Sequence, residues 1–373
     1  MDFAFSEEQE AVRDLARQIC EQVTQERLKE VEAGPDRFDR ALWTDLAEAN
    51  LLGIGLRQDV GGSGFGIVEV CLLLEELGRV TARVPAIATL AMSAPAVAAF
   101  GSPALRDALL PGVVAGDVVL TAALVEPGGE DPSAPATVAR RAGDEWRIEG
   151  SKICVPAADL AARVLIPARA DDGVVVAAID PKGGGVSLVR SMATSGLPEF
   201  RLEFDGAVAS DGDVLADAAG GADVVRSIVS HSLVGLCALQ VGIAERALEL
   251  TAEYTSGREQ FGRPIAAFQA VGQRAADAYI DVEAARLTMW QAAWRLAEGL
   301  PTAEEVMVAK FWAAEAGQRV CAAAQHLHGG IGVDLDYPLH RHTSLAKHVE
   351  LSLGAATPQL VRLGAAIAER ATA

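Results

Sequence analysis

The pattern of apolar and polar positions begins as that of a helical domain. Ser6 is followed three residues later by Gln9, and apolar residues then recur at helical spacing, which is typical of a capped amphipathic helix. Further helical patterns cover 42–51, 68–77 and 90–100, with a glycine cluster at 61–64. We therefore predict an N-terminal helical domain over residues 1–115.

The pattern changes twice more along the chain. Short β-type runs lie at 118–120, 146–148, 164–166 and 174–176, separated by turns rich in Gly, Pro and Asp, and predict a middle β domain over residues 116–222. From 224 to 257 the chain is apolar on nearly every side, as a helix inside a bundle is. Helical patterns follow at 266–298, 303–327 and 358–371. The expected fold is mainly α, with a middle β-barrel or sandwich domain and a C-terminal helical bundle over residues 223–373.

The charge balance excludes two classes of partner. Fifty-one acidic and 32 basic residues give a formal net charge of −19, a field that repels nucleic acid and anionic membrane surfaces. The long apolar run at 84–100 contains two prolines and falls short of the ~20 residues that cross a bilayer. No basic stretch leads into an apolar one at the start of the chain. These features predict a cytoplasmic protein without nucleic acid or membrane partners.

Residues that bind metals elsewhere are poorly arranged for it in this chain. Five cysteines are scattered without any CxxC spacing, so we interpret them as buried free thiols rather than a disulfide framework or a zinc site. A second candidate is the cluster His340, Arg341, His342 and His348. Arg341 would oppose a cation, and no recognised ligand spacing is present. We therefore expect no metal and interpret the cluster as a solvated or interface stretch.

The most specific motif is Ser256–Gln269, where a long helical pattern ends, a turn with two glycines and Pro264 follows, and another helix begins. Arg258 offers a guanidinium fork that suits a pyrophosphate, and Phe261 can cover an adenine or a ribose. Gly329 and Gly330 lack side chains, so the backbone there can approach a dinucleotide closely. The alternative is that Arg258 is only a cation at a helix C-terminus and that the glycines form only a turn.

Together with His328–Gly332, Asp336–Pro338, Gly61–Gly64 and Val125–Gly128, this motif resembles the acyl-CoA dehydrogenase family. The resemblance covers essentially the whole chain. It implies FAD-dependent α,β-dehydrogenation of an acyl-CoA thioester, with an electron-transfer flavoprotein or a similar acceptor. Members of this family hold FAD across a subunit interface, and the resemblance assigns contacts with a neighbour's FAD to Arg258, Phe261, Gly329 and Gly330. His326 is assigned to the same group, although the family usually has Gln at its position.

The half of the site that cradles the isoalloxazine departs from the family pattern. Val125 stands where the family has a Thr whose hydroxyl can bond the flavin, and Cys154 stands where a Trp forms the wall of the flavin pocket. Pro156 replaces a Thr and so removes both a hydroxyl and a backbone N–H donor.

The catalytic base of the family also has no counterpart in the matching positions. Leu353 occupies the position of the usual Glu, and Ser232 occupies the alternative position that some members use. Glu350, one helical turn before Leu353, and His231 are the two candidates for a replacement base. For both residues the commoner role is structural: a surface Glu in a mixed helix and a hydrogen-bonded His in a core.

These features predict a non-catalytic subunit of a heteromeric acyl-CoA dehydrogenase. The chain would complete the FAD site of a second acyl-CoA dehydrogenase chain in an α2β2 assembly, as the resemblance to actinobacterial heterotetrameric steroid-CoA dehydrogenases implies. A bulky acyl-CoA, such as a steroid side chain thioester, would suit its enlarged pocket. Two alternatives stay open: a self-sufficient homo-oligomeric dehydrogenase with an unusual base, and a flavin-free binding or scaffold protein of the same fold.

Overall fold

A computed structural model describes residues 4–129 and 131–372. The chain begins with helices, as predicted, and the Ser6–Gln9 capping box opens the first of them. A π-helical segment, Ile87–Ser93, precedes the fifth helix and continues into it. The helices of this part are α1 (Glu7–Cys20), α2 (Gln25–Ala33), α3 (Arg40–Glu48), α4 (Ile67–Arg79), α5 (Ala94–Phe100) and α6 (Pro103–Val114).

The middle of the chain forms an eight-stranded sheet with the order β6-β7-β3-β2-β4-β5-β8, in which β1 pairs with β4. The predicted runs at 118–120, 146–148, 164–166 and 174–176 fall in β1, β3, β4 and β5, respectively. Strands β3 and β7 pair antiparallel, and their register shifts between Lys152 and Val155. The strands are β1 (Val119–Ala122), β2 (Val138–Ala142), β3 (Glu145–Pro156), β4 (Ala161–Ala170), β5 (Gly173–Ile179), β6 (Val186–Met192), β7 (Pro198–Ser210) and β8 (Val214–Ala216).

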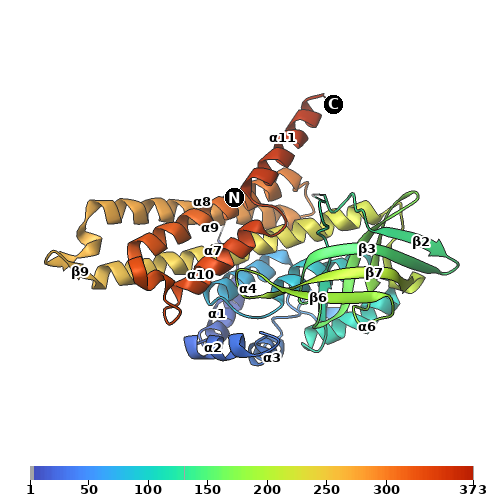
Figure 1. The fold of residues 1–373 in the computed structure, drawn as a ribbon, viewed down its shortest axis with the longest axis horizontal. Helices are drawn as coiled ribbons and strands as arrows, with labels where there is room; N and C mark the ends of the chain where they lie inside the picture. The colour runs from blue at the N-terminus through green and yellow to red at the C-terminus, as the bar shows by residue number, and fades with distance from the viewer. Residues whose placement is uncertain (1–3, 130, 373) are drawn as a thin grey trace.

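The last part is a helical bundle that lies beside the sheet, with α11 extending away from the body (Figure 1). The bundle consists of α7 (Gly221–Gly257), α8 (Gln269–Ala297), α9 (Ala303–His328), α10 (Leu339–Leu351) and α11 (Ala356–Thr372). A two-stranded hairpin, β9 (Glu259–Gln260) and β10 (Arg263–Pro264), joins α7 to α8. The predicted order of helical, β and helical parts is therefore confirmed.

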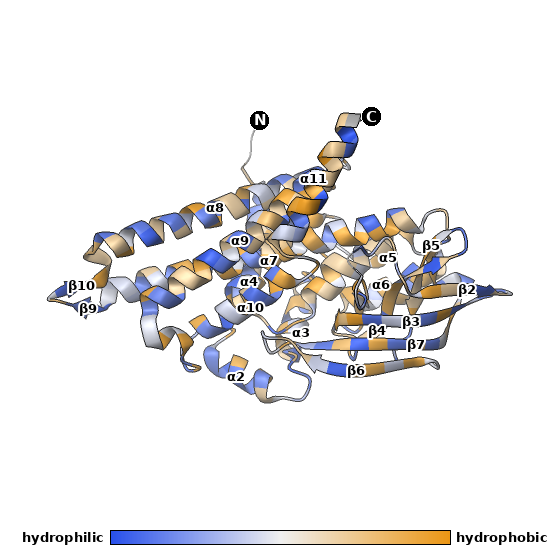
Figure 2. Ribbon diagram, turned by 45° about the horizontal axis from the view of Figure 1, so that its top comes forward, coloured by the Kyte–Doolittle hydropathy of each residue, from blue (hydrophilic) through white to orange (hydrophobic). Residues whose placement is uncertain are grey.

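Helix α7 is the core helix of the bundle. It is long and apolar enough to cross a membrane, but 72% of its most apolar window is buried inside the protein. It packs against α4, α8, α9 and α10, and Figure 2 shows apolar residues concentrated where the helices meet one another and the sheet. Burial of this apolar surface on all sides explains why the sequence pattern of α7 has no polar face.

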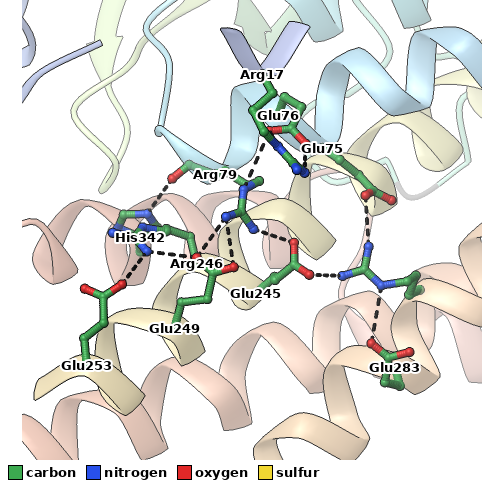
Figure 3. A network of polar contacts seen from close by, with 11 residues as sticks. Arg17, Glu75, Glu76, Arg79, Glu245, Arg246, Glu249, Glu253, Glu283 and His342 are labelled. Atoms are coloured by element: carbon green, nitrogen blue, oxygen red, sulfur yellow. Dashed lines mark hydrogen bonds and ion pairs between the residues drawn. The ribbon is translucent and has the colours of Figure 1, made fainter. Parts of the chain in front are cut away.

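A network of ion pairs joins α4 of the first part to α7 and α8 of the bundle (Figure 3). Arg79 of α4 contacts Glu245 and Glu249 of α7 at 2.5 and 2.8 Å. Arg286 of α8 contacts Glu75 of α4 at 3.0 Å and Glu245 at 2.7 Å. We call this set of residues the α4 clamp; it fixes the first helices against the bundle and so positions two walls of the cavity described next.

Candidate functional site

A cavity of about 660 Å³ lies where the first helices, the sheet and the bundle meet. Its wall is formed by the α2–α3 loop, α4, the π-helical segment, the loop that follows β1, strand β3, the β6–β7 turn, and helices α7 and α10. Most of the lining side chains are apolar, among them Leu77, Leu236 and Leu239. A cavity of this size and character suits a small-molecule ligand with a large apolar part.

Two segments of the cavity wall, the one after β1 and the end of β3, carry the residues that depart from the family's isoalloxazine-binding pattern. Val125 and Ile153 form an isolated β-bridge, which holds the Val125–Pro127 segment against the end of β3. Beside this bridge, the completely buried Lys152 contacts Glu126 at 2.7 Å between Nζ and Oε1. Glu126 also accepts hydrogen bonds from the backbone N–H groups of Ala136 and Thr137. Burial raises the pKa of Glu126, but the contacts with Lys152 and Thr137 outweigh it and lower the pKa to about 2.

Cys154 lies in the irregular part of β3, where the pairing with β7 shifts, and Pro156 lies just beyond it, paired with Glu199. Cys154 adopts a positive φ of 52°, its side chain is exposed, and it lines the cavity. Pro156 has no N–H to donate, and its carbonyl already accepts a hydrogen bond from Thr121 Oγ1 at 2.7 Å. The prediction of buried free thiols holds for the other four cysteines but is wrong for Cys154, because the shifted register turns its side chain towards the cavity.

Leu353 lines the cavity just after α10 ends, also with a positive φ, 56°. Its position is fixed from behind by Lys310 of α9, whose buried ammonium group donates to the backbone carbonyls of Val349 and Glu350 at 2.6 and 3.0 Å. Ser232 is completely buried in α7 and donates its hydroxyl to the carbonyl of Ile228. Neither residue places a proton acceptor in the cavity.

The two candidates for a replacement base point elsewhere. His231 lines a smaller cavity of about 160 Å³, with its Nδ1 2.9 Å from the Ser227 carbonyl, and burial lowers its pKa. The Glu350 carboxylate contacts Lys347 at 2.5 Å, and Glu350 does not line the large cavity. His231 therefore has the hydrogen-bonded core environment of its commoner alternative. The interpretation of Glu350 as a surface residue is wrong, because its side chain is only 12% exposed and is held by the ion pair with Lys347.

Arg258, Phe261, Gly329 and Gly330 are all exposed. The β9–β10 hairpin, which directly follows Arg258 and carries Phe261 in its loop, lies at one end of the bundle (Figure 1). Their common location follows from Tyr254 of α7, which stacks on His328 of α9 with ring centroids 4.6 Å apart. Arg258 lies one helical turn after Tyr254, and its amide donates a hydrogen bond to the Tyr254 carbonyl. Gly329 directly follows His328 with φ 64°, and the positions where a Cβ would stand on Gly329 and Gly330 are open. The structure therefore brings these four predicted residues together.

Phe261 breaks two rules of local structure. Its side chain is 92% exposed, and its φ is 55°. Together with Gly262 it forms a two-residue hairpin loop in which both residues have positive φ, a conformation that Asn-Gly or Gly-Gly normally supplies. An exposed aromatic ring in such a backbone conformation favours a binding role over a packing role. His326, assigned to the same group, is also exposed, on the last turns of α9.

The interpretation of the His340–His348 cluster as a solvated stretch is wrong. These residues form α10, in which Arg341 and His342 are each only 3% exposed. Arg341 pairs with Glu32 of α2 at 2.9 Å and also donates to Gln25. This burial depends on acceptors far away in the sequence, which a local pattern does not reveal. The described residues contain no group of three or more His, Cys, Asp or Glu side chains that could hold a metal ion.

The residues of the cavity do not fit an FAD held by this chain alone. The wall presents Val125, Cys154 and Pro156 in place of hydroxyl and N–H donors. The exposed end of the bundle, with Arg258 and open backbone at two glycines, does fit the pyrophosphate and adenosine of an FAD held by a neighbouring chain.

The sequence pattern did not reveal Glu199 of β7 and His348 of α10 as site residues. Both line the cavity, with 3.7 Å between Glu199 Oε1 and His348 Nε2. Burial raises the pKa of Glu199, whereas burial and the nearby cations Arg83 and Lys310 lower the pKa of His348 to about 4. No sequence signal connects two residues so far apart in the chain.

Family models match both helical parts of the chain. Residues 6–117 match the model described as the acyl-CoA dehydrogenase N-terminal domain, and residues 219–367 match the acyl-CoA dehydrogenase C-terminal domain. Among curated relatives, the acyl-CoA dehydrogenase FadE27 of Mycobacterium tuberculosis is 41% identical over 379 residues, which cover 99% of each chain. FadE28 of the same organism is 33% identical over 98% of each chain.

Solved structures agree over the same length. A variant of the Tcur3481–Tcur3483 steroid acyl-CoA dehydrogenase matches with a TM-score of 0.93 and 42% identity, covering 98% of this chain and 99% of the other. The ChsE4–ChsE5 complex from Mycobacterium tuberculosis matches with a TM-score of 0.94 and 39% identity over 99% of each chain. The name of each structure contains two proteins: Tcur3481 and Tcur3483 in one, ChsE4 and ChsE5 in the other.

Proposed function

The chain belongs to the acyl-CoA dehydrogenase family, and we propose that it is the non-catalytic subunit of a heteromeric member of that family. In this role the exposed end of its bundle completes an FAD site whose flavin cradle and catalytic Glu belong to a partner acyl-CoA dehydrogenase chain. When bound there, FAD would supply the hydride acceptor for α,β-dehydrogenation of the acyl-CoA, and an electron-transfer flavoprotein or a similar acceptor would receive the electrons. This chain supplies binding and orientation.

One observation carries the proposal: the features that fit FAD and those that do not lie at different places. Arg258, Phe261 and the Gly329–Gly330 turn are exposed at the end of the bundle, where a neighbouring chain can be reached. Cys154, Pro156 and Leu353, which replace flavin-holding and proton-accepting groups, line this chain's own cavity. Decay of function without selection would not spare one group and alter the other.

The comparisons support the same assembly. The Tcur3481–Tcur3483 and ChsE4–ChsE5 structures each name two components, and the former is called a steroid acyl-CoA dehydrogenase. An α2β2 complex with one FAD per pair of chains would leave this chain's cavity free for a bulky acyl group such as a steroid side chain. We place such a complex in the cytoplasm.

Arg258→Ala tests the assignment. Loss of a charge-assisted contact with pyrophosphate should weaken FAD binding by the complex about 10- to 100-fold. The affinity is measured on the complex of this chain with its partner chain, from the fluorescence of the FAD that the complex releases when it is diluted. Arg263→Ala is the matched control, because Arg263 lies in the same hairpin but stacks on Phe268 at 4.1 Å. Unchanged FAD affinity in the Arg258→Ala complex would contradict the proposed role of the bundle end.

A further inference from the structure

Glu199 and His348 form one of the polar regions in the wall of the mostly apolar cavity. Their side chains are 18% and 15% exposed and face each other at 3.7 Å between Oε1 and Nε2. That separation exceeds the 2.7–3.2 Å of a normal hydrogen bond. The two groups are thus close enough to contact one ligand atom together, but they do not satisfy each other.

The hydrogen bonds of Ser195 define which nitrogen of His348 carries the proton. Ser195 Oγ accepts from the Leu197 amide at 3.3 Å and lies 3.2 Å from His348 Nδ1. If the Ser195 hydroxyl donates to Nδ1, both its proton and its lone pairs are used, whereas a protonated Nδ1 would leave the hydroxyl proton without an acceptor among these partners. Nε2 therefore carries the N–H and directs it towards Glu199.

The protonation states agree with this arrangement. Burial and two nearby cations lower the pKa of His348 to about 4, so the ring is neutral near pH 7 and donates through Nε2 alone. Burial raises the pKa of Glu199, and the Cys154 thiol beside it contributes only a weak hydrogen bond. Four of the other charged groups on the wall have ion-pair partners: Glu126 and Lys152 pair with each other, Arg83 with Glu32, and Asp36 with Arg40. The remaining charged side chains of the wall are Arg37, Asp131 and Arg362.

We propose that Glu199 and His348 bind a hydroxyl group carried by a bulky apolar ligand. The hydroxyl oxygen accepts from His348 Nε2, and its proton is donated to the Glu199 carboxylate. A ketone satisfies only the His348 donor, and a hydrocarbon satisfies neither group. The inference deepens the proposed function, on which it rests for the nature of the ligand, because it names the polar group that the cavity selects.

A binding experiment with a matched set of steroids tests the inference. The probes are 5α-androstan-3-ol, 5α-androstan-3-one and 5α-androstane, which differ only at one carbon, and binding to the purified full chain is measured by displacement of an apolar fluorescent dye. We expect the alcohol to bind about tenfold more tightly than the hydrocarbon, with the ketone between them. No binding of any probe, or equal affinities for all three, would overturn the inference.

Three variants localise the effect. Glu199→Leu should reduce the preference for alcohol over hydrocarbon to less than about threefold, whereas Glu199→Gln, which can still accept a hydrogen bond, should retain most of it. Met192→Ala, a change at a half-exposed residue of the same wall, should alter the affinities for both probes by the same factor. A preference that survives Glu199→Leu would refute the role of the pair, provided that thermal unfolding shows the variant to be folded.

The outcome is independent of the flavin. The probes contain no CoA, and the assay needs neither FAD nor a partner chain, so failure here leaves the proposed role of Arg258 intact. Conversely, an alcohol preference in a chain that never joins an FAD complex would support the hydroxyl site and contradict the proposed function.

Discussion

At the scale of single residues, the ion pair between Glu126 and Lys152 shows how the altered cradle keeps its shape. Lys152 is completely buried, and Glu126 is its one ion-pair partner in the part of the chain that the structure describes. Because the Glu126 carboxylate also accepts from two backbone N–H groups, the pair ties the loop after β1 to β3. The Glu126–Lys152 ion pair therefore stabilises the wall of the cavity, although the groups that bind flavin in the family have been replaced there.

Glu126→Gln should strongly destabilise the protein. The substitution leaves the Lys152 ammonium group buried without a counter-charge, and we expect a loss of about 3–5 kcal/mol in the free energy of unfolding. Lys152→Met added to Glu126→Gln should restore part of that loss, because it removes the unpaired charge. Denaturant titrations of the two variants and the parent give the free energies of unfolding. A loss below about 1 kcal/mol in Glu126→Gln would show that the pair does not hold the wall.

At the scale of elements, the α4 clamp couples the first helices to the bundle through an excess of acid. The clamp contains the carboxylates Glu75, Glu245 and Glu249 and the guanidinium groups of Arg79 and Arg286. Of the three carboxylates that Arg286 contacts, Glu75 is the most deeply buried. Burial together with Glu245 and Glu76 raises the pKa of Glu75 to about 7 despite Arg286. The folded state therefore favours the protonated form of Glu75, although that form gives up the ion pair with Arg286.

The raised pKa of Glu75 predicts a pH dependence of stability. The folded state retains the proton up to about pH 7, and the unfolded chain loses it near pH 4.5, so this contribution is complete below pH 4.5 and is lost as the pH rises through 7. Glu75→Gln mimics the protonated form. Relative to the parent, its free energy of unfolding should rise by about 2–3 kcal/mol between pH 5 and pH 8.

Glu283→Gln is the control for this experiment, because Glu283 contacts the same Arg286 at 3.4 Å but is 39% exposed. The free energy of unfolding of Glu283→Gln, relative to the parent, should differ by less than about 1 kcal/mol between pH 5 and pH 8. A Glu75→Gln variant whose stability relative to the parent is the same at pH 5 and pH 8 would show that Glu75 is already ionised at pH 5.

At the scale of the whole molecule, apolar side chains remain exposed on the outer helices of the bundle. On α8, Ile280, Leu287 and Trp294 recur every seven residues with 63%, 68% and 48% exposure, and on α11 Leu360 and Val361 are 48% and 67% exposed. Helix α11 also extends away from the body of the chain (Figures 1 and 2). Exposed apolar residues at helical spacing favour packing against another chain.

Leu287→Asp should therefore weaken assembly with the partner chain at least tenfold, because a carboxylate replaces an apolar side chain that the complex would bury. Val189→Asp is the matched control: Val189 is 56% exposed on β6, away from the bundle. Size-exclusion chromatography with light scattering reports the complex over a concentration series. Assembly of the Leu287→Asp variant at the concentrations that suffice for the parent would exclude this face of α8 from the interface.

The three-part architecture could be predicted because its signals are local. Helix α7 has no polar face and α1 has a capping box. Strands β6 and β7 are absent from the predicted runs; β6 has no regular alternation, whereas β7 alternates Phe200, Leu202 and Phe204 with charged residues, a pattern that does indicate a half-buried strand. The site was only half predictable. Motifs identified Arg258 and Phe261, but the burial of Arg341 and the approach of Glu199 to His348 depend on contacts between distant segments.

The central claim is that this chain completes a partner's FAD site and holds no FAD of its own. The most direct test is the flavin absorbance per mole of protein, for the chain purified alone and after co-expression with an acyl-CoA dehydrogenase chain that retains the catalytic Glu. We predict a colourless isolated chain and one FAD per two chains in the complex. One FAD per chain in the isolated protein would contradict the claim, because the cavity would then hold flavin despite Cys154 and Pro156.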